Sequence, residues 1–209
     1  MDLGLGGKAA IVTGGTQGIG RATAMQLARE GAAVAIAARG REMLDSVAGE
    51  IRAAGGRVLA VRADVSEAED CERLVAEAVK AFGRLDILVN NAGTSARGEF
   101  EAVSDANWQA DLDLKLFAAV RLSRLAIPYM KQQGAGRIIN VTNIGAKQPR
   151  AGSMPTSVSR AAGLALTKAL SKELAPHNIL VNAVCIGSVR AGQHERRAAG
   201  SGVPLEQLY

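Results

Sequence analysis

This chain of 209 residues is poor in aromatic side chains, with one Trp, two Tyr and three Phe. Proteins that bind single-stranded nucleic acid use aromatic rings on which bases stack, and so few rings cannot build such a platform. The formal net charge of +5 permits attraction to anions, but the lysines and arginines are scattered and no zinc-finger spacing is present. We therefore expect no nucleic-acid partner.

Cysteine is equally scarce. Cys71 and Cys185 lie far apart in apolar surroundings, so the sequence predicts two reduced thiols and neither a disulfide framework nor a metal site. No apolar run is long enough to span a bilayer, and the acidic start of the chain lacks the apolar core of a signal peptide. These absences favour a cytoplasmic protein without a membrane partner.

The composition that remains is that of one folded domain. Hydrophobic residues make up 48% of the chain and charged residues 22%, which is too apolar for a disordered segment. The sequence shows no linker, low-complexity tract or internal repeat. We expect a single domain over residues 1–209, with a core of small aliphatic side chains.

Short apolar runs alternate with helix-length segments, and Gly, Asn or Asp marks each changeover. The pattern predicts strands at 8–13, 32–38, 57–62, 85–90, 137–142 and 179–184. It predicts helices at 19–30, 41–54, 67–82, 105–132 and 153–175. Parallel strands need crossover connections, so this alternation indicates an α/β doubly wound parallel sheet with helices on both faces. Ligands of such sheets bind beyond the carboxyl ends of the strands.

A glycine-rich turn follows the first predicted strand and opens directly into a helix, with the sequence Thr13-Gly14-Gly15-Thr16-Gln17-Gly18-Ile19-Gly20. Glycines let the backbone approach a pyrophosphate, and a helix N-terminus offers unpaired N–H groups and the positive end of a dipole. Asp64-Val65 follows the third strand and Asn90-Asn91-Ala92-Gly93 the fourth. The sequence therefore predicts a dinucleotide site at this edge of the sheet.

The glycines at 14, 18 and 20, together with Asn90 to Gly93, resemble the single-domain branch of the short-chain dehydrogenase/reductase family, from about Lys8 to Gly187. The resemblance implies a Rossmann-type fold, a small carbonyl or alcohol substrate, and a homodimer or homotetramer. It implies that Asp64 approaches the adenine and that Asn90 braces the central strands. The cofactor residues that it implies are Gly14, Thr16, Gln17, Gly18, Ile19, Gly20, Arg39, Asp64, Val65, Asn91, Ala92, Gly93, Arg160 and Gly187.

Two further expectations follow from the resemblance. Members of the family carry a seventh strand after the sixth, which we expect this chain to lack. We expect residues 188–209 to form part of the substrate lid.

The end of the second strand favours NADP(H) over NAD(H). A protein that binds NAD(H) usually has a carboxylate there, which accepts a hydrogen bond from the ribose 2′-hydroxyl. Here Ala38 is followed by Arg39, whose cation suits a 2′-phosphate. Gln17 is neutral, although some NADP(H)-binding relatives carry a basic residue at that place.

The catalytic residues that the family would provide are a Tyr-x-x-x-Lys pair, a serine and an asparagine. No Tyr-x-x-x-Lys occurs anywhere in this sequence. Alignment on the downstream segment Leu166-Thr167-Lys168 puts Thr156 in the tyrosine place and Arg160 in the lysine place. Asn143 occupies the serine place and Lys115 the asparagine place.

Two interpretations of this substituted centre stay open. In the first, the protein is an NADP(H)-dependent oxidoreductase that reduces a carbonyl, with Arg160 and Asn143 donating hydrogen bonds to the developing alkoxide. Lys115 would feel the like charge of Arg160, which lowers its pKa, and would supply the proton directly or through water and Thr156. The two cations would favour an anionic substrate. In the second, the protein binds NADP(H) without catalysis and serves as a sensor or assembly partner.

Overall fold

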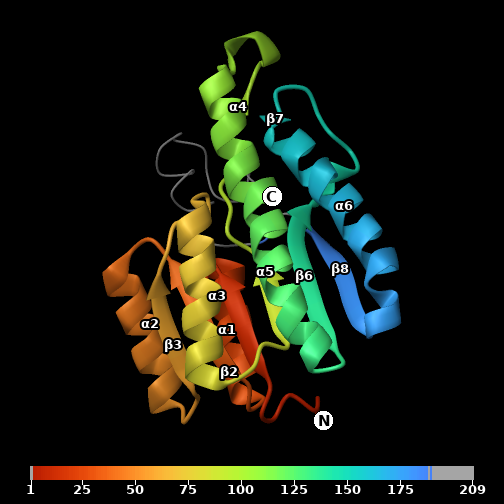
Figure 1. Ribbon diagram of the computed structural model, residues 1–209. Coiled ribbons are helices and arrows are strands. Elements are labelled where there is room, and N and C mark those ends of the chain that lie inside the picture. Colours follow the sequence, from red (N-terminus) through yellow and green to blue (C-terminus); the bar gives the residue numbers. More distant parts are fainter. Residues whose placement is uncertain (1, 188, 190–209) are drawn as a thin grey trace.

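Six apolar runs form one parallel sheet in the computed structural model, which describes residues 2–187 and 189 (Figure 1). The spatial order is β3-β2-β1-β4-β6-β8. The strands are β1 (Ala9–Thr13), β2 (Ala33–Ala38), β3 (Val58–Arg62), β4 (Ile87–Asn90), β6 (Gly136–Asn143) and β8 (Ile179–Ile186). Strands β1 and β2 are buried along nearly their whole length, which is why their sequences are continuously apolar rather than alternating.

Helices cover both faces of the sheet, as the alternating pattern predicts (Figure 1). One face is covered by α1 (Gly18–Arg29) and α2 (Arg41–Ala53), and the other by α3 (Ala68–Phe82), α5 (Ala118–Gln132) and α6 (Thr156–Glu173). Each face has its own core of buried aliphatic side chains. The doubly wound, Rossmann-type fold expected from the sequence is therefore confirmed.

The long predicted helix at 105–132 is interrupted. It consists of α4 (Asp105–Leu112), a π-helical turn η2 (Asp113–Phe117) and α5. The extra residue in such a turn changes the direction of the side chains around it, and π turns often occur at functional sites. Lys115 lies in the middle of this turn.

A second, small sheet was not predicted. The two-residue strands β5 (Arg97–Gly98) and β7 (Met154–Pro155) pair antiparallel, so the predicted helix at 153–175 begins only at Thr156. This pairing fixes the segment after β4 against the start of α6. Short 3-10 turns η1 (Phe100–Ala102), η3 (Ile144–Ala146) and η4 (Ala175–His177) complete the secondary structure of the described residues.

Strand β8 lies at the edge of the described sheet. The predictions of a missing seventh strand and of a lid at 188–209 fall outside the described residues, apart from Val189. Across the part of the chain that the structure describes, no helix is both long enough and apolar enough to cross a bilayer.

Candidate functional site

The glycine-rich turn after β1 is held against the end of β4. Gly14 has a φ of 64°, which favours glycine, and its N–H donates to the Ala37 carbonyl at 2.8 Å. The Thr13 hydroxyl accepts the N–H groups of Asn91 at 2.9 Å and Ala92 at 3.0 Å. Asn91 Nδ2 donates in turn to the Thr13 carbonyl at 2.9 Å. The cofactor residues predicted after β1 and after β4 are therefore in contact.

Gly20 allows helix α1 to start close to this turn. A Cβ atom at Gly20 would lie 2.2 Å from the Gly14 carbonyl oxygen and 2.4 Å from Asn91 Nδ2. The first turn of α1, which is fully described, contains no acidic side chain that would compete with a phosphate. The turn and the helix start thus form a cradle that suits a pyrophosphate.

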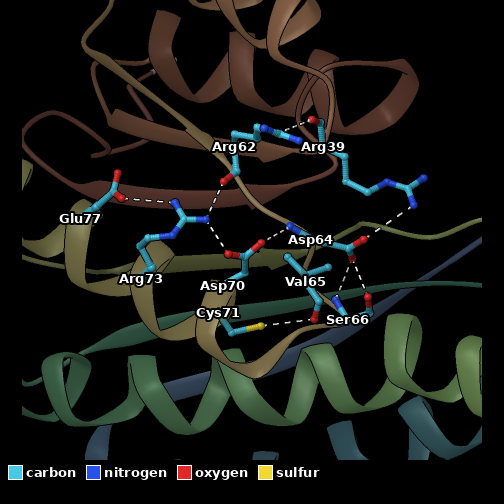
Figure 2. Close-up of polar contacts among 9 residues, drawn as sticks. All are labelled: Arg39, Arg62, Asp64, Val65, Ser66, Asp70, Cys71, Arg73 and Glu77. Carbon is cyan, nitrogen blue, oxygen red and sulfur yellow. Dashed lines mark hydrogen bonds and ion pairs between the residues drawn. The ribbon is translucent and has the colours of Figure 1, made fainter.

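Arg39 and Asp64 lie side by side beyond the ends of β2 and β3 (Figure 2). Arg39 Nη1 is 3.7 Å from Asp64 Oδ2, and the Arg39 side chain is 75% exposed. The Asp64 carboxylate also accepts hydrogen bonds from the N–H of Ser66 at 3.1 Å and from its hydroxyl at 2.6 Å. The residues predicted for the adenine and ribose end of the cofactor are therefore neighbours.

Helix α3 holds this corner in place (Figure 2). Asp70 accepts the backbone N–H of Asp64 at 2.7 Å, and Arg73 Nη2 donates to the Arg62 carbonyl at 2.8 Å. The Arg62 side chain donates through Nε to the carbonyl of Arg39 at 3.2 Å. Arg62, which was not among the predicted site residues, therefore brings a second guanidinium to the corner.

The centre of the sheet is braced as predicted. Asn90 Nδ2, at the end of β4, donates to Asn140 Oδ1 of β6 at 2.8 Å. Asn140 Nδ2 donates in turn to the Thr167 hydroxyl of α6 at 2.9 Å. These amides link the two central strands to α6, which also carries Thr156 and Arg160.

The structure brings Lys115 and Thr156 together. Lys115 Nζ donates to Thr156 Oγ1 at 2.8 Å, and the Lys115 side chain has an exposed fraction of 0%. Thr156 Oγ1 donates to the Ala96 carbonyl at 2.7 Å and accepts the Ala96 N–H at 3.1 Å. The hydroxyl therefore ties α6 to the segment after β4 as well as to Lys115.

A further residue, Asp111, completes this cluster. Asp111 lies on α4, four residues before Lys115, and its carboxylate forms an ion pair with Lys115 Nζ. It also accepts a hydrogen bond from the Ser159 hydroxyl of α6 at 2.6 Å. Asp111 was not among the predicted site residues, although the spacing of four places both charges on one helical face.

Arg160 lies beside Gly93, where predicted cofactor residues converge. Its Nη1 donates to the Val141 carbonyl at 2.7 Å, and a Cβ atom at Gly93 would lie 2.4 Å from its Nη2. Burial lowers the pKa of Arg160, an effect that the Asp111 charge opposes. A side chain at position 93 would therefore require this guanidinium to move.

The pKa of Lys115 is lowered, as expected from the sequence, but the main cause is not the charge of Arg160. Burial lowers the pKa of its ammonium group. The hydrogen bond and the charge of Asp111 oppose this effect, and the like charge of Arg160 adds to it. The predicted influence of Arg160 is therefore present, while desolvation is the larger cause.

Unpartnered polar atoms surround a cavity at this place. Its empty volume, open mouth included, is about 440 Å³, and its lining includes Lys115, Thr142, Ser159 and Arg160. Three described residues of the lining have a buried polar atom without a hydrogen-bond partner, namely Asn90 Oδ1, Thr142 Oγ1 and Arg160 Nε, and Asn143 Oδ1 next to Thr142 is a further such atom. Buried polar groups are normally paired, so these atoms indicate a site for a polar ligand. Asn143 follows Thr142 at the end of β6, and among the described residues it makes no hydrogen bond with Lys115 or Thr156.

Comparison with known proteins agrees with this geometry. Residues 8–200 match the family model described as short chain dehydrogenase. The chain is 38% identical over 187 residues to dehydrogenase/reductase SDR family member 4 of Homo sapiens, covering 89% of this chain and 67% of that protein. It is 35% identical over 187 residues to the 3-oxoacyl-[acyl-carrier-protein] reductase of Synechocystis, covering 89% and 76%. A solved structure described as a short-chain dehydrogenase/reductase from Burkholderia xenovorans superimposes with a TM-score of 0.91 at 34% identity, covering 98% of this chain and 80% of that one.

Proposed function

Since the chain belongs to the short-chain dehydrogenase family, whose members are oxidoreductases that use nicotinamide cofactors, we propose that it is an NADP(H)-dependent reductase of small carbonyl compounds. One observation carries the proposal. The cradle at Gly14 and Gly20 shares an edge of the sheet with the cavity that Lys115 and Arg160 line. A dinucleotide and a carbonyl oxygen can therefore meet beside the Arg160 guanidinium, with the covered Lys115, which is paired with Asp111, in the wall of the cavity.

The residues that would hold NADP(H) fall into three groups along this edge. The pyrophosphate would bind at the start of α1, and the adenine end at the corner of β2 and β3. The nicotinamide end would lie at the end of β4 and beside α6. In that order the residues are Gly14, Thr16, Gln17, Gly18, Ile19 and Gly20; Arg39, Asp64 and Val65; and Asn91, Ala92, Gly93, Arg160 and Gly187. The bound cofactor supplies the hydride.

Arg39 supports the choice of NADP(H) over NAD(H). Its pair with Asp64 spans 3.7 Å and is mostly exposed. Such pairs contribute at most about 1 kcal/mol, so a 2′-phosphate can displace the carboxylate at little cost. We expect Arg39→Ala to weaken NADPH binding about tenfold or more and to leave NADH binding nearly unchanged, as measured by fluorescence titration, because a charge-assisted bond to the phosphate contributes about 1.5–3 kcal/mol.

The proposed chemistry uses two groups of the cavity lining, Lys115 and Arg160, together with two residues next to lining residues, Asn143 and Thr156. Negative charge develops on the carbonyl oxygen during reduction, and Arg160 and Asn143 are the proposed hydrogen-bond donors to it. Lys115 is fully covered, so its proton would pass through the Thr156 hydroxyl, 2.8 Å away. Because Arg160 brings positive charge to the cavity and the Asp111 carboxylate is held by Lys115 rather than free to act as a base, carbonyl reduction is favoured over alcohol oxidation.

The test is stopped-flow oxidation of bound NADPH against a panel of ketones, aldehydes and keto acids. Lys115→Met should slow the step by about 10²–10⁴-fold, which is the usual contribution of a positioned acid. A matched substitution of a surface lysine, Lys131→Met on α5, should leave the rate unchanged. If no member of the panel causes a loss of NADPH absorbance, the proposal is overturned.

A second function is favoured by the hydrogen bonds of Thr156. Its hydroxyl already contacts Lys115 Nζ and both the N–H and the carbonyl of Ala96. A hydroxyl so occupied suits a fixed scaffold that binds NADP(H) without catalysis, as a sensor or assembly partner. Tight NADPH binding together with no hydride loss in the stopped-flow experiment would select this alternative.

Other expectations belong to the same proposal. We propose a single domain over residues 1–209, of which 188–209 contribute to the substrate lid. We propose a homodimer or homotetramer in the cytoplasm, with no nucleic acid or membrane as partner. Sedimentation equilibrium tests the oligomeric state, since a monomeric mass would contradict it.

A further inference from the structure

The Asp111 carboxylate is a charged group that the proposed reaction does not yet use. Its side chain is only 1% exposed. The oxygen Oδ2 accepts the Ser159 hydroxyl at 2.6 Å, while Oδ1 contacts Lys115 Nζ and lies 3.3 Å from Thr156 Oγ1. Asp111 therefore contacts Lys115 and two polar side chains of α6, Thr156 and Ser159.

The two charges of this pair depend on each other. Burying a single ion costs several kcal/mol even after the protein relaxes, and removal of one partner leaves the other unpaired. Among the described residues, the charged groups that act on Lys115 are Asp111 from α4 and Arg160 from α6. Asp111 is the one of opposite sign, and so it alone can stabilise the ammonium ion by charge.

The ion pair of Asp111 and Lys115 also fixes the direction in which the Lys115 ammonium group points. Lys115 sits in the π-helical turn, and its side chain passes beneath Gly93, whose Cβ position is 3.8 Å from Lys115 Cγ. Beyond that point Nζ is held between the Asp111 carboxylate and the Thr156 hydroxyl. Without Asp111, nothing on α4 would hold the ammonium group at Thr156 rather than turn it away from the like charge of Arg160.

We propose that Asp111 is a positioning residue, which keeps Lys115 protonated and directs one of its N–H bonds at Thr156. The catalytic consequence rests on the proposed reductase function. The carbonyl is reduced as it gains a hydride at carbon, which leaves the cofactor oxidised, and a proton at oxygen. That proton leaves Thr156 Oγ1, which takes one from Lys115 Nζ. The neutral amine, now next to an unpaired carboxylate, regains its proton from water.

The test compares Asp111→Asn with Asp113→Asn. Asp113 is a matched control, because it lies in the same segment and pairs with Arg121 at 3.5 Å, but its side chain is 25% exposed and does not reach Lys115. Two quantities are measured between pH 6 and pH 10 for each variant. One is the rate of single-turnover NADPH oxidation, and the other is the titration midpoint of Lys115 from its ¹³Cε resonance in nuclear magnetic resonance spectra.

In Asp111→Asn we expect the Lys115 midpoint to fall by at least about one pH unit, because the favourable charge is lost. The rate at pH 8 should fall about tenfold or more and recover as the pH is lowered, since the ammonium form then returns. Asp113→Asn should match the wild type in both. A purely structural role of Asp111 would lower the rate equally at every pH and leave the midpoint in place, and that result would overturn the proposal.

If Asp111→Asn does not fold, the double variant Asp111→Leu, Lys115→Met answers the same question. It leaves neither charge unpaired, so we expect it to fold, to bind NADPH, and to reduce substrate slowly with a rate independent of pH over this range. A double variant that keeps the pH profile of the wild type would overturn the proposal. A wild type without turnover would overturn the proposed function, whereas a lowered Lys115 midpoint in Asp111→Asn would still support the role of Asp111.

Discussion

Gly20→Ala offers a stringent test of the cofactor cradle. Alanine normally stabilises a helix relative to glycine by about 0.5–1 kcal/mol. At Gly20, however, the added Cβ would lie 2.2 Å from the Gly14 carbonyl oxygen and 2.4 Å from Asn91 Nδ2. Since real Cβ atoms essentially never come closer than 3.0 Å, the helix and the turn must move apart by about 0.8 Å.

The cost of that movement can be estimated from the contacts that it disturbs. Overpacking of a close contact costs about 1–3 kcal/mol. The Asn91 amide, which donates to the Thr13 carbonyl at 2.9 Å, would lose a hydrogen bond worth about 1 kcal/mol. The gain in helix propensity offsets part of this. We therefore expect a net destabilisation of about 2 kcal/mol.

Urea denaturation followed by circular dichroism measures this change. With a slope of about 2 kcal/mol per molar urea, the midpoint of Gly20→Ala should fall by about 1 M. NADPH affinity should fall as well, because the same turn receives the pyrophosphate. Gly49→Ala is the matched control: Gly49 lies inside α2 with nothing within 4 Å of its Cβ position, so it should be stabilised by about 0.5–1 kcal/mol. Equal stabilisation of both variants would refute the reasoning.

Three other predictions concern stability and reactivity. Burial raises the pKa of Asp86, but Arg84 and a backbone N–H outweigh it, so the pKa lies below the ordinary value of 3.8. The stability that Asp86 contributes is therefore present above pH 3.8 and lost as the pH falls through the lowered pKa; Asp86→Asn should cost about 1–3 kcal/mol at pH 7 and less at pH 3 in urea denaturation. Burial raises the pKa of Cys71 to about 11, so its thiol should resist maleimide at pH 8 until the protein unfolds, as peptide mass mapping will show. Ser104 accepts a backbone N–H at the start of α4 at 3.3 Å, and Ser104→Ala should lower the thermal midpoint through a loss of about 0.5–1 kcal/mol.

Strands β1, β2 and β4 were predictable because they are buried along nearly their whole length. Continuous apolar runs bounded by glycine or asparagine leave little choice of element, so the strand predicted at 32–38 is found at Ala33–Ala38. The small sheet of β5 and β7 was not predictable. Each of its strands has two residues, and their pairing depends on contacts between segments more than fifty positions apart.

The π-helical turn and the residues around it are a second feature that could not be predicted from the sequence. The segment 105–132 contains no glycine, and its one proline, Pro128, lies in α5, so the sequence carries no signal for the extra residue at 113–117. The resemblance to the family directed attention to Lys115, Asn143, Thr156 and Arg160, which occupy the places of its catalytic residues. Asp111 occupies none of those places, and its partner in α6, Ser159, is forty-eight residues away.

The Asp111 carboxylate changes what the two cations of the site can attract. The sequence predicts that Lys115 and Arg160 together favour an anionic substrate, but Asp111 neutralises Lys115 within the protein. The charge left over at the cavity is that of Arg160, whose Nη1 already donates to the Val141 carbonyl. Because Nη1 is already bonded, the Arg160 guanidinium can donate strong hydrogen bonds either to a ribose hydroxyl of the cofactor or to a carboxylate of the substrate, but not to both at once. We therefore expect a substrate that needs one hydrogen bond to its carbonyl oxygen rather than one that is held by two cations.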